Sequence, residues 1–240
     1  MRLAKYLAHC GVASRRGAEK LISHGVVTVG GERVIDPARD VDASSGVAVN
    51  GTPVLPEAHE VWAVNKPENV TSTAHEPGRR RAVTDLVNSE RRLYPVGRLD
   101  ADSTGLILLT NDGELANRLT HPRYGVPKTY LARLRGPISD REITRLAEGV
   151  KLDDGPTAPA EVKRKGEREV EITIREGRNR QVRRMVQKVG NEVADLRRVR
   201  FASLELGDLP LGASRQLSRS EIKRLWKDAG PMPERPEDTE

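Results

Sequence analysis

The sequence predicts an α+β protein, in which a small unit of two helices and a β-hairpin precedes a larger domain with a mixed, largely antiparallel sheet. Three observations predict this architecture. Helical patterns do not follow each strand pattern in turn, as a doubly wound parallel sheet would require. The segment NGTPVLPEAHE, with its prolines and glycine, separates two patterned regions. A chain of 240 residues can also bury the cores of one small and one larger domain.

The chain divides into four segments. We expect an N-terminal unit at residues 1–49, a linker at 50–59, a main domain at 60–229 and a disordered tail at 230–240. The tail carries one arginine against four acids, so the rest of the chain is more basic than the overall net charge of +6 indicates. A basic body favours a polyanionic partner such as nucleic acid.

The N-terminal unit is expected to fold as helix, helix and hairpin. Apolar residues at positions 3, 6, 7 and 10 share one helical face, and Gly11 ends that helix. Ser14 can cap a second helix. The segment VVTVGGERV then predicts a hairpin, because Gly30 and Gly31 adopt positive φ without steric cost.

The main domain alternates strands and helices irregularly. VWAVNKP predicts a strand that Pro67 stops, and TSTAHEPGRRRA predicts a polar loop. The patterns that follow predict, in order, a buried strand, a helix, a strand, a helix, a hairpin and a helix. Their segments are LILLTND, ELANRLTH, KTYLARLRG, ISDREITRLAEGV, VKRKGEREVEITIRE and NRQVRRMVQKVG.

Several classes of protein are disfavoured. No apolar run approaches the roughly 18 residues of a membrane span, and the N-terminus does not resemble a signal peptide, so we expect a soluble cytoplasmic protein. Cys10 is the single cysteine, which excludes an internal disulfide. The five histidines show no paired spacing, so no metal site is expected. Phosphate-binding glycine motifs are absent, which leaves nucleotide-driven chemistry without support.

Cations concentrate in the N-terminal unit. Five lie within the first 20 residues, largely off the apolar helix faces, and we expect them to form one phosphate-binding surface. They are Arg2, Lys5, Arg15, Arg16 and Lys20.

The stretch VGRLDADSTGLILLTND holds the candidate chemistry, with two acids in line at Asp100 and Asp102. Three interpretations are open. The acids could form a turn before the strand. They fit the Asp-x-Asp-x-Thr pattern of magnesium-dependent aspartyl-phosphate phosphatases. Alternatively, Asp100 could be a nucleophile kept ionised by an arginine, from Arg98 nearby or from the later helix.

Three motifs in order resemble one family. GRLDADSTGLILLTNDGELANRLTHP, KTYLARL and EGRNRQVRRMV resemble the bacterial ribosomal-RNA pseudouridine synthases of the RsuA type, with the large-subunit, RluB-like group favoured. RLAKYLAHCGVASRRGAEKLISHGVVTVGGERV resembles the S-four RNA-binding module that precedes them. The match covers about residues 1–228.

The resemblance implies roles for individual residues. Asp100 matches the catalytic aspartate that attacks the target uridine, so that the base detaches, rotates and rejoins through carbon five without a cofactor. Tyr130 matches the tyrosine that stacks on the base and assists removal of the carbon-five proton. Arg183 matches the basic residue that pairs with the aspartate. Leu106 and Ile107 are expected to wall the pocket.

Other cations are expected to contact RNA. They are Lys66, Arg98, Arg178 and Arg180, together with the loop arginines Arg79, Arg80 and Arg81. The expected activity is conversion of one uridine to pseudouridine, in 23S rather than 16S rRNA, by a monomer acting on rRNA or a subunit-assembly intermediate. The alternative is a noncatalytic rRNA-binding or ribosome-assembly factor with the same fold.

Overall fold

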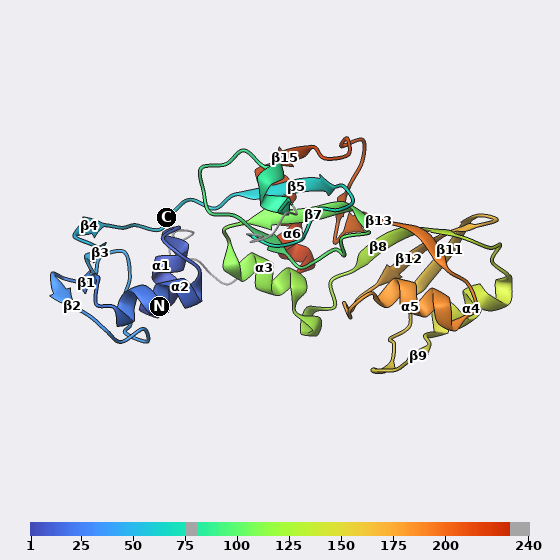
Figure 1. The fold of residues 1–240 in the computed structure, drawn as a ribbon, viewed down its shortest axis with the longest axis horizontal. Coiled ribbons are helices and arrows are strands. Elements are labelled where there is room, and N and C mark those ends of the chain that lie inside the picture. Colours follow the sequence, from blue (N-terminus) through green and yellow to red (C-terminus); the bar gives the residue numbers. More distant parts are fainter. Residues whose placement is uncertain (75–80, 231–240) are drawn as a thin grey trace. The chain divides into compact units, whose positions relative to one another are not determined.

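The computed structural model describes residues 1–74 and 81–230. The chain forms two compact units (Figure 1). The first comprises Met1–Glu60 with the short segments Ser89–Arg92 and Asn111–Gly113, and the second comprises the rest of the chain. Residues 231–240 of the expected tail, and Arg79 and Arg80 of the polar loop, lie outside the described residues.

The first unit has the expected order of two helices and a hairpin. The Ser14 hydroxyl caps the second helix by accepting a hydrogen bond from the Gly17 amide, and Gly30 and Gly31 turn the hairpin at φ values of 59° and 86°. Four strands pair antiparallel in the order β2-β1-β3-β4. The elements are α1 (Leu3–His9), α2 (Arg15–Ser23), β1 (Val27–Val29), β2 (Glu32–Arg33), β3 (Val47–Val49) and β4 (Thr52–Pro53).

The expected linker at 50–59 is partly wrong. Asn50 and Gly51 form a tight turn at positive φ, and Thr52–Pro53 is strand β4 at the edge of the first unit's sheet. Proline is tolerated there because an edge strand needs hydrogen bonds on one side only. Pro53 therefore belongs to a strand rather than to a spacer.

The second unit is built on one mixed sheet of nine strands. Seven follow the order β11-β12-β8-β13-β7-β5-β15, while β14 pairs with β13 and β6 with β7. Every pairing in this sheet is antiparallel except that of β13 with β7. The strands are β5 (Val61–Lys66), β6 (Tyr94–Val96), β7 (Thr104–Thr110), β8 (Lys128–Leu134), β11 (Glu161–Gly166), β12 (Glu169–Ile174), β13 (Val193–Phe201), β14 (Leu204–Glu205) and β15 (Ser214–Gln216).

Helices cover this sheet on both faces. The remaining elements are the 3-10 turns η1 (Val83–Leu86) and η2 (Pro122–Tyr124), the pair β9 (Lys151–Leu152) and β10 (Gly155–Pro156), and the helices α3 (Gly113–Thr120), α4 (Asp140–Glu148), α5 (Gln181–Lys188) and α6 (Arg219–Asp228). In β7, Leu106 and Leu108 enter the core that α3 and α6 close, whereas Ile107 and Leu109 enter the core that α4 and α5 close. This burial on both faces explains the continuous apolar run LILL.

The largely antiparallel α+β fold is confirmed, but the sequence patterns did not reveal strand β13. Three of its nine residues are arginines, and irregular pairing with β8 breaks the two-residue alternation around Arg198 to Arg200. A β-bulge shifts side chains between the two faces, and so it hides the strand pattern. None of the helices in the described part of the chain is both long and apolar enough to cross a membrane.

Candidate active site

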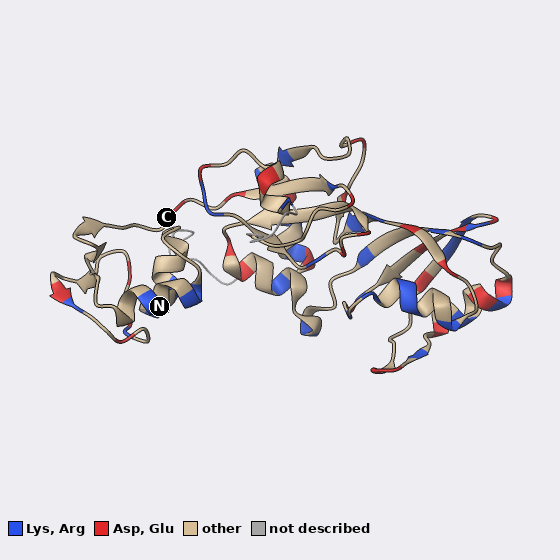
Figure 2. Cartoon of the chain, viewed as in Figure 1, with Lys and Arg blue, Asp and Glu red and all other residues tan. Residues whose placement is uncertain are grey.

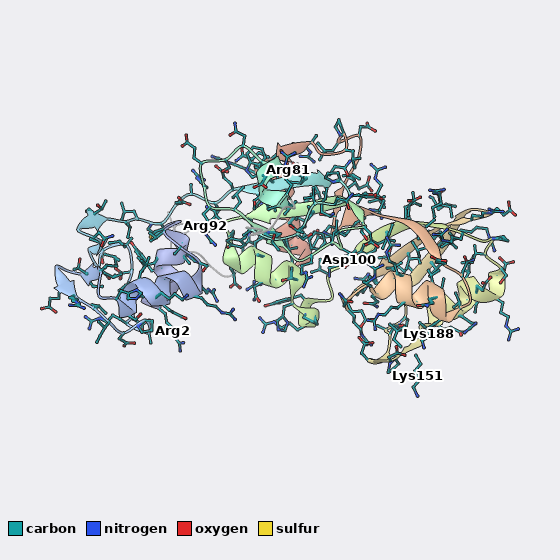
Figure 3. The ribbon with its side chains drawn as sticks, viewed as in Figure 1. Arg2, Arg81, Arg92, Asp100, Lys151 and Lys188 are labelled. Carbon is teal, nitrogen blue, oxygen red and sulfur yellow. The ribbon has the colours of Figure 1, made fainter. Side chains whose placement is uncertain are left out.

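Asp100 lines a pocket of about 310 Å³ within the second unit. The loop before β7, strands β8 and β13, and the segment that leads into α5 contribute its walls. Tyr130 lines the same pocket from β8, where it is 9% exposed. Figure 3 labels Asp100 at this position. The structure therefore brings together the predicted nucleophile and the predicted base-stacking residue.

The backbone around Asp100 is a turn with fixed ends. The Ser103 amide donates to the Asp100 carbonyl over 3.1 Å, which closes the turn. The buried Ser72 hydroxyl accepts from the Leu99 amide at 3.0 Å and donates to the Leu99 carbonyl at 2.8 Å. The Asn69 amide donates to the Ala101 carbonyl at 2.9 Å. These bonds hold the residues on both sides of Asp100 and leave its carboxylate free to face the pocket.

The sequence predicts Lys66 as an RNA contact at the wall of the cleft, but the structure buries this residue. Its side chain is completely buried, and its ammonium group donates to the Pro67 and Val70 carbonyls at 2.9 Å each. Burial lowers the pKa of Lys66 to about 8, and the charges of Asp102 and Asp100 oppose that shift. Lys66 thus stabilises the turn at residues 67–70, and Asn69 of this turn bonds to the loop that carries Asp100.

Arg183 contacts Asp102 instead of the predicted Asp100. Its guanidinium donates to the Asp102 carbonyl at 2.9 Å and lies 3.4 Å from the Asp102 carboxylate. Arg180 forms two parallel bonds to the same carboxylate, at 3.0 and 2.9 Å. Hydrogen bonds from Arg180, followed by the charge of Arg183, lower the pKa of Asp102. The two acids of this turn therefore face different surroundings. Asp102 is bound by the arginines at the start of α5, whereas Asp100 lines the pocket.

The predicted pocket wall is also wrong. Leu106 and Ile107 are fully buried on opposite faces of β7, in two different cores, and neither lines the pocket. Alternation along a strand makes this separation unavoidable. The apolar side chains that do line the pocket include Leu99, Leu196 and Phe201.

The predicted RNA-contacting cations of this unit differ in exposure and in how many of their hydrogen-bond donors are already used within the protein. Arg98 is exposed at the pocket and has no ion pair within the described part of the chain. Arg180 lines the pocket but is already bound to Asp102. Arg178 donates to Glu176 and to backbone carbonyls of the β9–β10 hairpin, including Pro156 at 2.6 Å, so its donors are largely used.

Sequence reasoning missed three residues of the site. Ser72 gave no signal, because its contact with Leu99 links segments far apart in the chain. Lys128 could have been found, since residues 128 and 130 lie two apart on one strand and so share a face. Arg198 lies on the strand that was not predicted, directly opposite Tyr130 in the sheet register.

The five predicted cations of the first unit have no ion-pair partner among the residues that the structure describes. Figure 2 shows Lys and Arg on α1 and α2. Arg2, Arg15, Arg16 and Lys20 are exposed and Lys5 is half-buried. None of the five has an ion pair with any residue between 1 and 74 or 81 and 230. A carboxylate within reach would neutralise such a surface, so its absence there leaves these charges available to phosphate.

The fold matches a known class of enzyme. A solved crystal structure of a pseudouridylate synthase superposes with a TM-score of 0.70 and 31% identity, covering 94% of this chain and 99% of that chain. The fold is therefore that of a pseudouridine synthase.

Sequence relatives agree. The RNA pseudouridylate synthase model matches residues 60–188, and the S4 domain model matches residues 1–47. Ribosomal large subunit pseudouridine synthase B of Bacillus subtilis is 45% identical over 231 residues, which cover 93% of this chain and 95% of the relative. Dual-specificity RNA pseudouridine synthase RluF of Salmonella typhi is 38% identical over 229 residues, covering 94% and 78%. The chain belongs to the RNA pseudouridylate synthase family, and the resemblance drawn from its motifs is confirmed.

Proposed function

We propose that this enzyme converts one uridine of ribosomal RNA, in the large-subunit 23S rRNA, to pseudouridine, with Asp100 as the nucleophile. The 45% identical Bacillus subtilis relative is named as a large-subunit enzyme, which supports that choice of substrate. Its similarity spans almost the whole of both chains, so the N-terminal unit is included in the comparison.

The observation that carries the assignment of Asp100 is the contrast between the two acids of the turn. Both oxygens of Asp102 are bonded to Arg180. The Asp100 carboxylate lines the pocket and accepts no hydrogen bond from the described residues, 1–74 and 81–230. A nucleophile must face its substrate, and of the two carboxylates only that of Asp100 lines the pocket beside Tyr130 without being paired to an arginine.

The reaction can proceed with the groups at hand. An Asp100 oxygen bonds to C1′ of the target nucleotide as the C1′–N1 bond breaks, and the electron pair of that bond leaves with the base. The base rotates within the pocket, and C5 then attacks C1′ and displaces the carboxylate. C5 loses a proton and N1 gains one, so atoms and charge balance without an oxidant or reductant.

Tyr130 supports the base outside the RNA stack. A uridine must leave its helix before its glycosidic bond can be attacked, and stacking on an aromatic ring lowers the cost of holding it outside. Its phenol oxygen is also proposed to relay the C5 proton, taking it up while its own hydroxyl proton passes to solvent, from which N1 is protonated. Arg183 acts on the nucleophile indirectly, because it holds the Asp102 end of the turn.

The first unit supplies affinity for RNA. Its unpaired cations suit phosphate contacts, and two modules that bind one RNA gain affinity through the chain that joins them. A noncatalytic assembly factor would keep these binding properties but would not need Asp100. The two alternatives therefore differ in product formation and not in binding.

The assay uses the purified full-length chain with 23S and 16S rRNA transcripts in the presence of a chelator. We expect one pseudouridine position in 23S rRNA. The phosphatase alternative predicts a magnesium requirement and no change in the RNA, and the binding-factor alternative predicts RNA binding with no product. Absence of pseudouridine from both transcripts would refute the proposal.

Replacement of Asp100 by asparagine separates catalysis from binding. Asp100→Asn removes the nucleophile with little change in volume, so we expect product formation to fall by at least about 10⁴-fold, with an unchanged dissociation constant for 23S rRNA. The control is Asp208→Asn, at an exposed aspartate elsewhere in the same unit. If Asp102→Asn were inactive while Asp100→Asn kept its activity, the nucleophile would be Asp102.

A further inference from the structure

Two cations at the pocket of Asp100, the buried Arg198 and the half-buried Lys128, have no part in the steps described above. Lys128 and Arg198 line it from the adjacent strands β8 and β13. Both lie against the ring of Phe201. The Lys128 ammonium nitrogen is 5.7 Å, and the Arg198 guanidinium carbon 4.9 Å, from the ring centroid. The two positive charges therefore share one end of the pocket.

Arg198 has a hydrogen-bond donor to spare. Its side chain is 2% exposed, and its Nε donates to the Leu106 carbonyl at 2.6 Å. Its Nη2 is buried and has no hydrogen-bond partner among the described residues. A buried donor without an acceptor costs about 1–3 kcal/mol, and more when it is charged. Such a group is retained more readily where a ligand completes its bonds.

Lys128 also has hydrogen-bond donors that a ligand can use, because its ammonium group carries three. Its ammonium donates to the Val126 carbonyl at 3.0 Å. Burial, and to a lesser extent the charge of Arg198, lowers the pKa of Lys128 to about 8. Neither cation has a carboxylate within ion-pair distance in residues 1–74 and 81–230. Two poorly solvated charges without a counterion favour a ligand that carries, or develops, negative charge.

The depth of these cations indicates which part of the RNA they meet. Arg98 and Arg180 line the same pocket and are exposed, so phosphate groups can reach them. Arg198 lines the same pocket but is only 2% exposed, so we expect it to meet the everted base rather than a phosphate. Uracil presents the carbonyl oxygens O2 and O4, which accept hydrogen bonds, whereas cytosine presents an amino group in place of O4. Lysine and arginine side chains only donate.

We propose that Arg198 and Lys128 bind the carbonyl oxygens of the everted uracil, select it over cytosine, and stabilise the negative charge that the base acquires as it leaves C1′. When the C1′–N1 bond breaks, its electron pair stays on the base and is shared with O2 and O4. Donors already placed at those oxygens stabilise this charge more than that of the neutral base. The inference rests on the proposed function and names the residues that recognise its target.

The test measures single-turnover kinetics and binding with a 23S rRNA fragment that contains the position modified by the wild type. Arg198→Gln should slow product formation by about 100-fold, as removal of an oxyanion donor does, while the dissociation constant for the fragment changes by less than about threefold, because the phosphate contacts remain. Arg197→Gln is the matched control, since it lies one residue along the same strand and is exposed. It should change neither quantity.

A second fragment, with cytidine at the target position, separates recognition from structural support. The wild type should bind the uridine fragment more tightly than the cytidine fragment, and Arg198→Gln should narrow that ratio. Lys128→Met, which retains the side-chain length, should narrow it too, and provides the test if Arg198→Gln does not fold. A lower melting temperature with an unchanged uridine-to-cytidine ratio would overturn the inference. So would a wild-type rate in both variants. An inactive wild type would overturn the proposed function and this inference with it.

Discussion

Ser72 shows how a single side chain fixes the nucleophile. Its hydroxyl bonds both the amide and the carbonyl of Leu99, the residue before Asp100. Both of these backbone groups are buried, so without Ser72 they would lose their partners in a place that water does not fill easily. The hydroxyl thus stabilises the loop and fixes the backbone from which the Asp100 side chain extends.

Ser72→Ala is expected to affect both stability and rate. The loss of both bonds should lower the free energy of unfolding by about 1–3 kcal/mol. Displacement of the carboxylate should lower kcat by about 10- to 100-fold. Ser214→Ala, which removes a single hydroxyl bond to the Leu86 carbonyl in the same unit, is the control and should leave kcat unchanged. Chemical denaturation and single-turnover assays measure the two effects. Equal kcat in both variants would show that Ser72 does not position Asp100.

At the scale of elements, the parallel contact between β7 and β13 joins the two halves of the site. Arg198 of β13 pairs with Gly105 of β7, only a few residues after Asp100. A Cβ at Gly105 would lie 2.3 Å from the Arg198 carbonyl oxygen, and Gly105 has a φ of 101°. Glycine is required there because the backbones approach more closely than any side chain allows.

Gly105→Ala should therefore weaken the sheet and the site together. Steric overlap and a strained φ should cost at least about 2 kcal/mol of unfolding free energy. The β13 strand must move away, so Arg198 and Tyr130 should lose their alignment with Asp100, and product formation should fall even at temperatures where the variant is folded. Gly166→Ala is the control, because a Cβ there meets nothing closer than 3.7 Å. Thermal unfolding and product formation are measured for both variants. A Gly105→Ala protein with wild-type stability and activity would show that the close approach of β7 and β13 does not require glycine.

At the scale of the whole molecule, the cations fall into two groups: those in internal ion pairs and those without an ion-pair partner among the described residues. In the second unit, many arginines are consumed by internal ion pairs, such as Arg184 with Asp154 and Arg215 with Glu221. In the first unit, the cations on α1 and α2 have no such partners among the described residues. The net charge alone does not reveal this difference, because paired and unpaired arginines count equally.

Replacing Arg15 and Arg16 together by alanine should weaken binding to rRNA and reduce its dependence on salt. The logarithm of the binding constant falls linearly with the logarithm of the salt concentration. If each arginine contacts one phosphate, the magnitude of this negative slope should decrease by about 1–2. Lys223→Ala with Arg224→Ala removes the same charge from exposed positions on α6 and should leave the slope unchanged. Equal slopes for the two double variants would remove α2 from the RNA-binding surface.

The sequence by itself determined the α+β class, nearly all the helices and the family, because hydrophobic spacing, caps and contiguous motifs are local along the chain. It also singled out Asp100 and Tyr130, which the fold places at one pocket. Tertiary structure decided what depends on neighbours distant in sequence. It gave Arg183 to Asp102, buried Lys66, separated Leu106 from Ile107, and brought Lys128 and Arg198 to the pocket. A residue's type fixes which bonds it can form, but only the packed sheet fixes which partner stands within a few ångströms of it.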